Sequence, residues 1–270
     1  MIENRFFYFS PGRGNQRGIA LFVVIVFVML SMLLALWASR TSLFSEMIVG
    51  NDADYQRAFE AAQALMQDAE LDIRGENANG TVCTPDTGDS KVCRRSSVPQ
   101  IPLTEAEVAP LLSELANKTY QCSHGLCVKH TKKQDFWNIP SSVTSQGFNL
   151  AQMTGTNTSD GSPVGARYGM YTGAQLGSSG NANPILADRS SATSGGWYWI
   201  EVLKYDESSR TSGLIVAQSA GVSTANNSYL SANLVPNVMY RITALAYGRK
   251  AGMPPVVIQE TYVRQKTKDL

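Results

Sequence analysis

The sequence predicts an α+β protein in which a long N-terminal helix, half membrane-spanning and half amphipathic, packs on a C-terminal antiparallel β-sheet with long loops. The first observation is an apolar run from Ile19 to Ala38 whose only polar residue is Ser31. The second is a helical periodicity that continues to Arg74 without a proline. The third is the last third of the chain, where β-branched and aromatic segments alternate with turn residues. No helix of crossover length separates these segments, so antiparallel pairing is expected.

The apolar run is long enough to cross a membrane as a helix, because about 20 residues span a hydrocarbon core of roughly 30 Å. Beyond it, apolar residues recur at threes and fours, which is typical of an amphipathic helix that rests on a domain. A continuous helix to Arg74 would be about 84 Å long. Gly75 is a natural stop, and Gly50-Asn51 is the expected place for a kink or a short unwound turn. The alternative is a membrane span followed by an unrelated surface helix.

Charge sets the expected orientation of this run. The charged residues flanking it are Arg5, Arg13, Arg17 and the acid Glu3 before it, and Arg40, Glu46, Asp52 and Asp54 after it. The positive-inside bias keeps the N-terminus in the cytoplasm and exports the bulk of the chain. Removal as an ordinary secretory signal is disfavoured, because the apolar core is long and Leu36 is bulky for a signal cleavage site. A formal net charge of +1 indicates no nucleic-acid partner.

Four cysteines lie on the side predicted to be exported: Cys83, Cys93, Cys122 and Cys127. In an oxidising compartment an even set of this kind indicates disulfides. Three pairings are open, and local pairing is favoured because short loops close at the least entropic cost. The two histidines, His124 and His130, interleave with the second pair, so tetrahedral zinc is an alternative. The spacing matches no common zinc motif, and the expected site contains a disulfide hairpin and no metal.

The middle of the chain is predicted to be largely irregular. Leu103–Lys118 is a candidate short helix, with Thr104 and Glu107 spaced as a capping box. Ser141–Gly196 is rich in Gly, Ser, Thr and Asn and is expected to form long surface loops, with a brief strand at Arg167–Tyr171.

The predicted strands follow in the last third: Gly196–Tyr205, Gly213–Ala217, Val238–Tyr247 and Val256–Val263. In the third of these, four apolar side chains fall on one face: Tyr240, Ile242, Ala244 and Ala246. In the first, Trp197, Tyr198 and Trp199 alternate across the strand. One side of that strand is therefore expected in the sheet core, and the other is a candidate partner contact.

No residue pattern indicates catalysis or a cofactor. Paired carboxylates, a metal triad and a Ser/His/Asp set cannot be assembled from the sequence. Asn157–Ser162 and Asp86–Ser90 are oxygen-rich but lack the acidic spacing of a calcium loop, so plain turns are expected. Gly195-Gly196 precedes a strand and therefore cannot cradle phosphate at a helix start. The sequence predicts a protein that is not an enzyme, and a membrane-anchored enzyme is the weakest hypothesis.

Five short motifs lie in the long helix and in the last two predicted strands: Arg17-Gly18-Ile19-Ala20-Leu21, Met47-x-x-Gly50-Asn51, Ala58-Phe59-x-Ala61-Ala62, Tyr240-Arg241-Ile242-Thr243-Ala244 and Val257-Ile258-Gln259-x-Thr261-Tyr262. Together they resemble the PilX family of type IV pilus minor pilins. The resemblance covers most of residues 16–75 and 195–265, and it implies the type IV pilin fold. The loops between these regions carry none of it.

The resemblance also implies a processing pathway and partners. Residues 1–18 would be a prepilin leader, 19–38 the transmembrane and fibre-core half of the helix, 39–74 its amphipathic half and 75–270 the exported globular domain. A prepilin peptidase would cut between Gly18 and Ile19, with N-methylation of Ile19, although major pilins commonly have Phe there. The chain would wait in the inner membrane as a single span and then enter a surface pilus through the assembly platform, beside other minor pilins and the major pilin.

Val23, with its neighbour Phe22, is the expected assembly determinant. Major pilins carry Glu as the fifth mature residue, where it is thought to neutralise the N-terminal amine of an adjacent subunit. Val23 cannot do so, and the K-type pseudopilin of type II secretion shares this lack. The resemblance therefore implies a subunit that initiates or caps a pilus at its tip. The alternatives are an adhesion module that contacts a host or a large tip adhesin, and a pseudopilin of a secretion machine.

Overall fold

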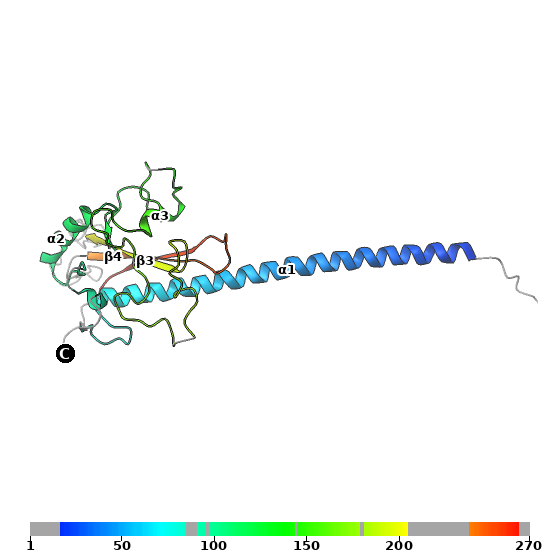
Figure 1. The fold of residues 1–270 in the computed structure, drawn as a ribbon, viewed down its shortest axis with the longest axis horizontal. Coiled ribbons are helices and arrows are strands. Elements are labelled where there is room, and N and C mark those ends of the chain that lie inside the picture. Colours follow the sequence, from blue (N-terminus) through cyan, green and yellow to red (C-terminus); the bar gives the residue numbers. More distant parts are fainter. Residues whose placement is uncertain are drawn as a thin grey trace, which may run out of the picture. The chain divides into compact units, whose positions relative to one another are not determined.

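The computed structural model describes residues 17–84, 91–95, 98–143, 145–178, 181–204 and 238–264 (Figure 1). Its first element is α1, Arg17–Arg74, one continuous helix. The predicted kink or unwound turn at Gly50-Asn51 is wrong, because helical structure continues through both residues. Two compact units meet between Ala53 and Asp54, so α1 contributes to both of them.

In the first unit, every side chain of α1 from Ile19 to Val49 is exposed. Within the described residues, α1 is the one helix that is long and apolar enough to cross a membrane. Three of its hydroxyl groups donate to the helix's own carbonyls: Ser31 Oγ to Val28 O at 2.8 Å, Thr41 Oγ1 to Trp37 O at 3.0 Å and Ser45 Oγ to Thr41 O at 3.0 Å. Such bonds satisfy polar groups where lipid offers no partner.

Helix α1 ends in a Schellman motif. Gly75 adopts φ +69°, which glycine reaches without the steric penalty of a Cβ atom. Its N–H donates to Asp72 O at 3.1 Å, and the N–H of Glu76 donates to Leu71 O at 2.9 Å. These two bonds satisfy carbonyls at the helix end, and the predicted stop at Gly75 is confirmed.

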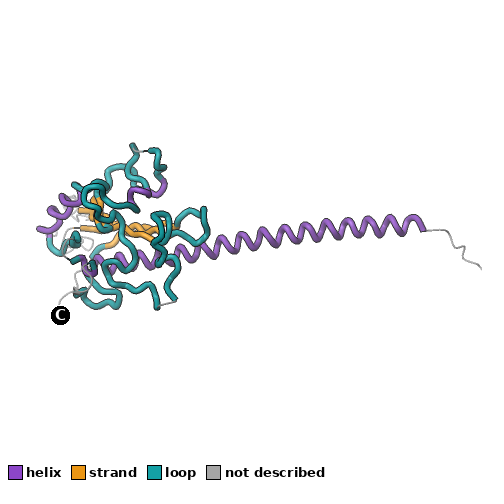
Figure 2. The backbone as a smooth tube through the Cα atoms, in the orientation of Figure 1, coloured by secondary structure: helices purple, strands orange, loops and turns teal. Residues whose placement is uncertain are grey.

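The second unit contains a five-stranded sheet in the order β1-β2-β3-β4-β5. Figure 2 draws the strands in orange, with loops around them. The strands are β1 Cys122–Ser123, β2 Leu126–Val128, β3 Gly196–Lys204, β4 Val238–Ala246 and β5 Val256–Tyr262. Strands β3, β4 and β5 pair antiparallel as predicted. The pairing of β2 with β3 is parallel, which corrects the wholly antiparallel prediction. The described residues between β2 and β3 form turns, irregular segments and two helices of three and four residues, and no long crossover helix.

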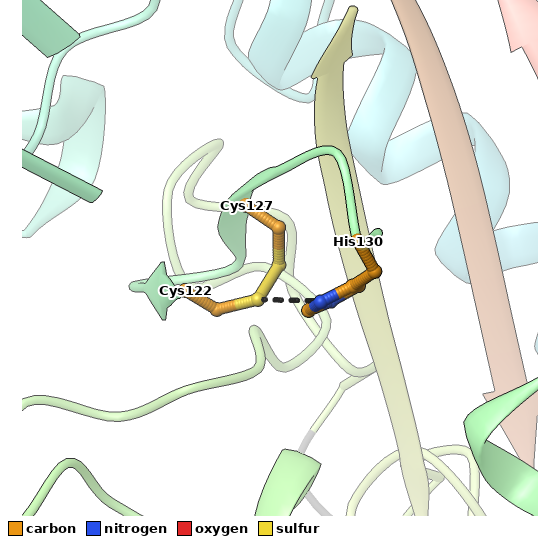
Figure 3. Close-up of side chains that lie close together, drawn as sticks. All are labelled: Cys122, Cys127 and His130. Carbon is orange, nitrogen blue, oxygen red and sulfur yellow. Dashed lines mark hydrogen bonds between the residues drawn. A yellow bond between two sulfur atoms is a disulfide. The ribbon is translucent and has the colours of Figure 1, made fainter. Parts of the chain in front are cut away.

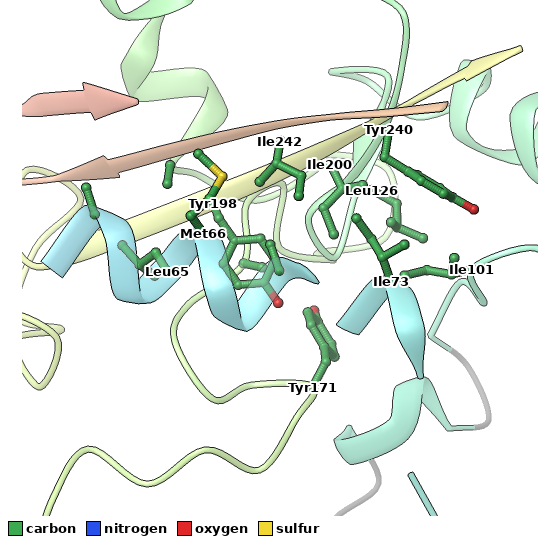
Figure 4. Packing of buried hydrophobic residues seen from close by; sticks show 14 of the residues in the cluster. Leu65, Met66, Ile73, Ile101, Leu126, Tyr171, Tyr198, Ile200, Tyr240 and Ile242 are labelled. Atoms are coloured by element: carbon green, nitrogen blue, oxygen red, sulfur yellow. The ribbon is translucent and has the colours of Figure 1, made fainter. Parts of the chain in front are cut away.

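One face of the sheet packs against the amphipathic part of α1 (Figure 4). The helix contributes mostly small side chains, whereas the sheet contributes large ones such as Tyr198 and Tyr240. The apolar residues of α1 that are at most 1% exposed are Ala58, Ala61, Ala62, Leu65, Ala69 and Ile73. The predicted shared face of β4 is confirmed, because Tyr240, Ile242, Ala244 and Ala246 all belong to this cluster. Small helix side chains let the helix backbone approach the large sheet side chains closely, which favours the dense packing typical of protein interiors.

The opposite face of the sheet is covered by the segment predicted to form surface loops. Trp197 and Trp199 are 8% and 1% exposed, and they pack with Phe136, Met153 and Val164. Trp199 Nε1 donates to Met153 O at 3.0 Å. The prediction of an exposed partner contact beside Tyr198 is therefore wrong. The irregular segment forms a second layer over the sheet and is not a set of peripheral loops.

The remaining elements are short. Helix α2, Glu105–Ala116, confirms the predicted helix, and Glu107 Oε2 accepts the N–H of Thr104 at 3.2 Å in the expected capping box. The others are the 3-10 turns η1 Val92–Arg94 and η2 Phe136–Asn138, and the helix α3 Leu150–Met153. The predicted strand at Arg167–Tyr171 is wrong, since the chain turns there and only Ala166 bridges to Tyr198. The predicted strand Gly213–Ala217 lies outside the described residues.

Truncating a helix side chain in the core tests this packing. Leu65 is fully buried and Leu103 is 56% exposed. We expect Leu65→Ala to lower the free energy of unfolding by about 2–5 kcal/mol, because it removes buried methyl groups and leaves a cavity. The matched Leu103→Ala change should cost less than about 0.5 kcal/mol. Guanidinium unfolding of the full chain in detergent, followed by near-ultraviolet circular dichroism, measures both; equal losses would contradict the assigned core.

Candidate functional site

The residues predicted to act in processing and assembly lie near the start of α1. Gly18 and Ile19 are in its first turn, and Ile19 is 71% exposed. Phe22 is 68% exposed and Val23 44% exposed. No acidic residue occurs in α1 before Glu46. From Ile19 to Ser39 the exposed surface of this helix is therefore uncharged and almost entirely apolar.

Three aspartates of α1 are buried and bond to segments that are distant in sequence. Asp54 is 4% exposed, and its carboxylate accepts the backbone N–H groups of Arg249 at 2.9 Å and Lys250 at 3.2 Å. It thereby holds the connection between β4 and β5. A Cβ atom at Gly248 would lie 2.1 Å from this carboxylate, so any larger residue there would displace the Asp54 side chain.

Asp72 forms a buried ion pair with Arg94. The two carboxylate oxygens of Asp72 accept hydrogen bonds from Arg94 Nε at 2.8 Å and from Arg94 Nη2 at 2.5 Å. Tyr198 adds a hydroxyl bond to the same carboxylate at 3.3 Å, and the guanidinium lies 4.1 Å from the Tyr171 ring centre. A bidentate pair with both partners almost fully buried is strongly oriented. It ties η1, next to the Cys83–Cys93 disulfide, to the helix.

Asp68, one turn earlier on α1, holds the turn that was predicted to be a strand. Its carboxylate accepts the Gly169 N–H at 2.8 Å and the Thr172 hydroxyl. Burial raises the pKa of Asp68 from 3.8 to about 6, and the neighbouring Asp72 carboxylate adds to the rise. The sequence places Asp68 and Asp72 among the polar positions of an amphipathic helix. Only the folded chain shows that loops cover them.

The cysteines pair locally: Cys83 with Cys93 and Cys122 with Cys127. Figure 3 shows the second disulfide beside His130, whose Nε2 lies 3.7 Å from Cys122 Sγ. Burial lowers the pKa of His130. His124 is directed elsewhere, with Nδ1 2.9 Å from Ser123 Oγ, and burial lowers its pKa to about 4. The four residues considered as zinc ligands from the sequence therefore do not converge on one point. His124 bonds to Ser123, and the sulfurs of Cys122 and Cys127 are bonded to each other.

A cavity of about 310 Å³ lies beside this hairpin. Its walls combine aromatic rings with basic and amide side chains, including His130, Lys132, Lys133, Phe136, Phe148 and Gln152. Such a mixture suits a small ligand with an anionic group. No sequence motif marks this cavity, because its walls come from separate segments.

The polar side chains of the oxygen-rich turn Asn157–Ser162 bond within the turn and to neighbouring protein groups. Asp160 Oδ1 accepts the Ser162 N–H at 3.0 Å, and Oδ2 pairs with Lys118 Nζ at 2.6 Å. Asn157 Nδ2 donates to Cys122 O at 2.8 Å. These contacts agree with the predicted turn. The second candidate, Asp86–Ser90, lies outside the described residues.

A long apolar N-terminal helix that continues into an α+β domain defines a membrane-anchored subunit with the pilin fold. Residues 123–264 match the family model described as type IV pilus assembly protein PilX, C-terminal, and residues 17–66 match PilX N-terminal. The chain belongs to the PilX family and is a component of type IV pilus assembly, which is a structural function. Comparisons with curated proteins and with solved structures found no significant match.

The raised pKa of Asp68 predicts how stability changes with pH. The folded chain binds a proton at this carboxyl more tightly than the unfolded chain does. Proton binding at Asp68 therefore makes its full contribution to the free energy of unfolding below about pH 3.8, and this contribution is lost as pH rises through about 6. The loss is at most about 3 kcal/mol, at 1.36 kcal/mol per pKa unit. Asp68→Asn keeps an acceptor for Gly169 without the charge. We expect it to stabilise the chain at about pH 8 and to flatten the pH dependence in urea unfolding.

The matched control is Asp72→Asn, one turn away. It leaves Arg94 buried without its counter-ion, so we expect a loss of about 3–5 kcal/mol near neutral pH. Destabilisation by both substitutions to the same extent would contradict the different roles assigned to the two carboxylates.

Proposed function

We propose that this chain is a minor pilin that initiates or caps type IV pilus assembly at the fibre tip, together with other minor pilins. The observation that carries the proposal is Val23. It is an uncharged side chain on an exposed apolar helix that has no acid before Glu46. Membership of the PilX family supports an assembly role.

The argument for a tip position rests on the cost of a buried charge. Cleavage between Gly18 and Ile19 would leave a positive amine on Ile19. An unpaired charge in an apolar helical core is unfavourable by several kcal/mol, so each such amine needs an acid from a neighbouring helix. This chain can accept an acidic partner for its own amine but offers none at Val23. It therefore suits a position with no subunit ahead of it.

A second candidate function is adhesion at the tip. It is favoured by the 310 Å³ cavity beside the Cys122–Cys127 hairpin, whose lysines and aromatic rings suit an anionic ligand or an acidic group of a tip adhesin. Deletion that leaves pili intact but abolishes attachment would favour this function. Deletion that abolishes piliation supports initiation, and a defect confined to protein secretion would indicate a pseudopilin.

Processing can be tested directly by N-terminal sequencing. In cells with prepilin peptidase we expect the mature chain to begin at Ile19. Gly18→Val should block cleavage, because a bulky side chain replaces the glycine before the cut, whereas the nearby Gly14→Val should not. A chain that still begins at Met1, or that begins near Ser39, contradicts the pilin pathway.

Fibre position can be tested by adding the missing charge. We expect labelled wild-type chain only at the ends of sheared pili in immunogold microscopy. Val23→Glu should allow incorporation along the shaft, because the new carboxylate can pair with the amine of a subunit ahead. Val24→Glu is the matched control, since its side chain points about 100° away around the helix. Wild-type label distributed along the shaft would contradict tip placement; membrane levels of all three proteins are compared by immunoblot.

A further inference from the structure

We propose that reduction of the Cys122–Cys127 disulfide creates a zinc site formed by Cys122, Cys127 and His130. The three donor atoms already lie within 4.8 Å of one another, and all three residues are buried (Figure 3). Thiolate and imidazole are the ligands that Zn²⁺ prefers. His124, the fourth residue of the sequence pattern, is not part of the site, because its ring bonds to Ser123.

One of the three donor separations already matches what zinc requires. Bond lengths of about 2.3 Å to sulfur and about 2.0 Å to nitrogen place neighbouring tetrahedral donors roughly 3.5–3.8 Å apart. The 3.7 Å between Cys122 Sγ and His130 Nε2 meets this spacing. Breaking the sulfur–sulfur bond frees Cys127 Sγ to separate from Cys122 Sγ by a similar distance.

The hairpin keeps its shape by contacts other than the disulfide. The N–H of Val128 donates to Gln121 O at 3.1 Å, and the N–H of Ile200 donates to Gly125 O at 2.7 Å. Asn157 Nδ2 donates to Cys122 O at 2.8 Å. These bonds hold β1 and β2 against the rest of the sheet, so the ligands stay close together after reduction.

The backbone at His130 is held as well. Its N–H donates to Glu201 Oε1 at 3.3 Å, and Glu201 is in turn paired with Arg241. His130 also forms part of the wall of the 310 Å³ cavity. A zinc ion held by three protein ligands requires a fourth, and this cavity offers room for a water molecule.

The chemistry balances in two steps. A dithiol reductant breaks the Cys122–Cys127 bond, which yields two protein thiols and the disulfide of the reductant. Zn²⁺ then displaces one proton from each thiol and binds the two thiolates and neutral His130. The site carries no net charge, which removes much of the cost of burying two thiolates. The hairpin can therefore be cross-linked either by the disulfide or by a bound zinc ion, and the redox state of the two cysteines determines which one forms.

The test uses the full chain in detergent with Cys83→Ser and Cys93→Ser, so that a single cysteine pair remains. After anaerobic reduction with a phosphine, Co²⁺ is titrated as a spectroscopic probe. We expect one Co²⁺ per chain, with sulfur-to-cobalt charge-transfer absorption and the visible bands of tetrahedral coordination. The oxidised protein should bind none. The matched chain with Cys122→Ser and Cys127→Ser, which keeps the other pair, should lack these bands.

The histidines provide the sharper comparison. His130→Ala should weaken Co²⁺ binding at least about 10-fold, whereas His124→Ala should leave it within about twofold. Zn²⁺ should also slow alkylation of Cys122 and Cys127 in the reduced parent, a readout that does not depend on absorption. Equal Co²⁺ affinity of the two histidine variants, Co²⁺ binding by the oxidised chain, or alkylation unaffected by Zn²⁺ would each overturn the proposal. Tryptophan fluorescence checks that every variant remains folded.

Discussion

The burial of the amphipathic part of α1 against one face of the sheet is the interaction on which the domain depends. Small helix residues such as Ala61 and Ala62 lie in the same cluster as Tyr198 and Tyr240. Fully burying a large aliphatic side chain, as at Leu65 and Ile73 of the same cluster, stabilises a fold by about 1.5–3 kcal/mol. The contact also sets the position of every polar group on that helix face. The buried aspartates reach their partners only because α1 lies where it does.

Those aspartates stabilise a domain in which regular secondary structure is limited. Long irregular segments leave backbone groups that a sheet ladder would otherwise satisfy. Asp54 and Asp68 accept backbone N–H groups from two such segments. Arg167 has the complementary role, because its guanidinium donates to the carbonyls of Asp188, Ser191, Ser194 and Gly196. The irregular layer over the sheet is therefore tied down by side chains, at the cost of desolvating several charges.

The first unit, which ends at Ala53, has no buried core of its own among the described residues 19–49. Its helix surface is apolar and exposed, so it needs lipid or other helices around it. Three of its hydroxyl groups donate to carbonyls of the same helix. One position, Val23, carries the proposed distinction between a tip subunit and a shaft subunit. The globular unit, with its two disulfides and its cavity, is where contacts specific to this chain can be built.

Local patterns in the sequence were sufficient for the long helix, its end at Gly75, helix α2 and the antiparallel run of β3, β4 and β5. Each of these depends on periodicity, a cap or a turn residue, which act over a few positions along the chain. The alternation of side chains in Trp197–Trp199 indicated that this strand has two faces. It did not indicate which residues cover the face that carries Trp197 and Trp199. Those residues include Phe136, Met153 and Val164, which are distant in sequence.

The sequence by itself determined the family, the membrane-type helix and the character of the main core. Only the tertiary structure decided the parallel pairing of β2 with β3, the burial of Asp68 and Asp72, and the separation of His124 from His130. The physical reason is common to all three. A polar or short segment carries no periodic signal strong enough to fix its partner, so contacts across the folded chain determine where it lies.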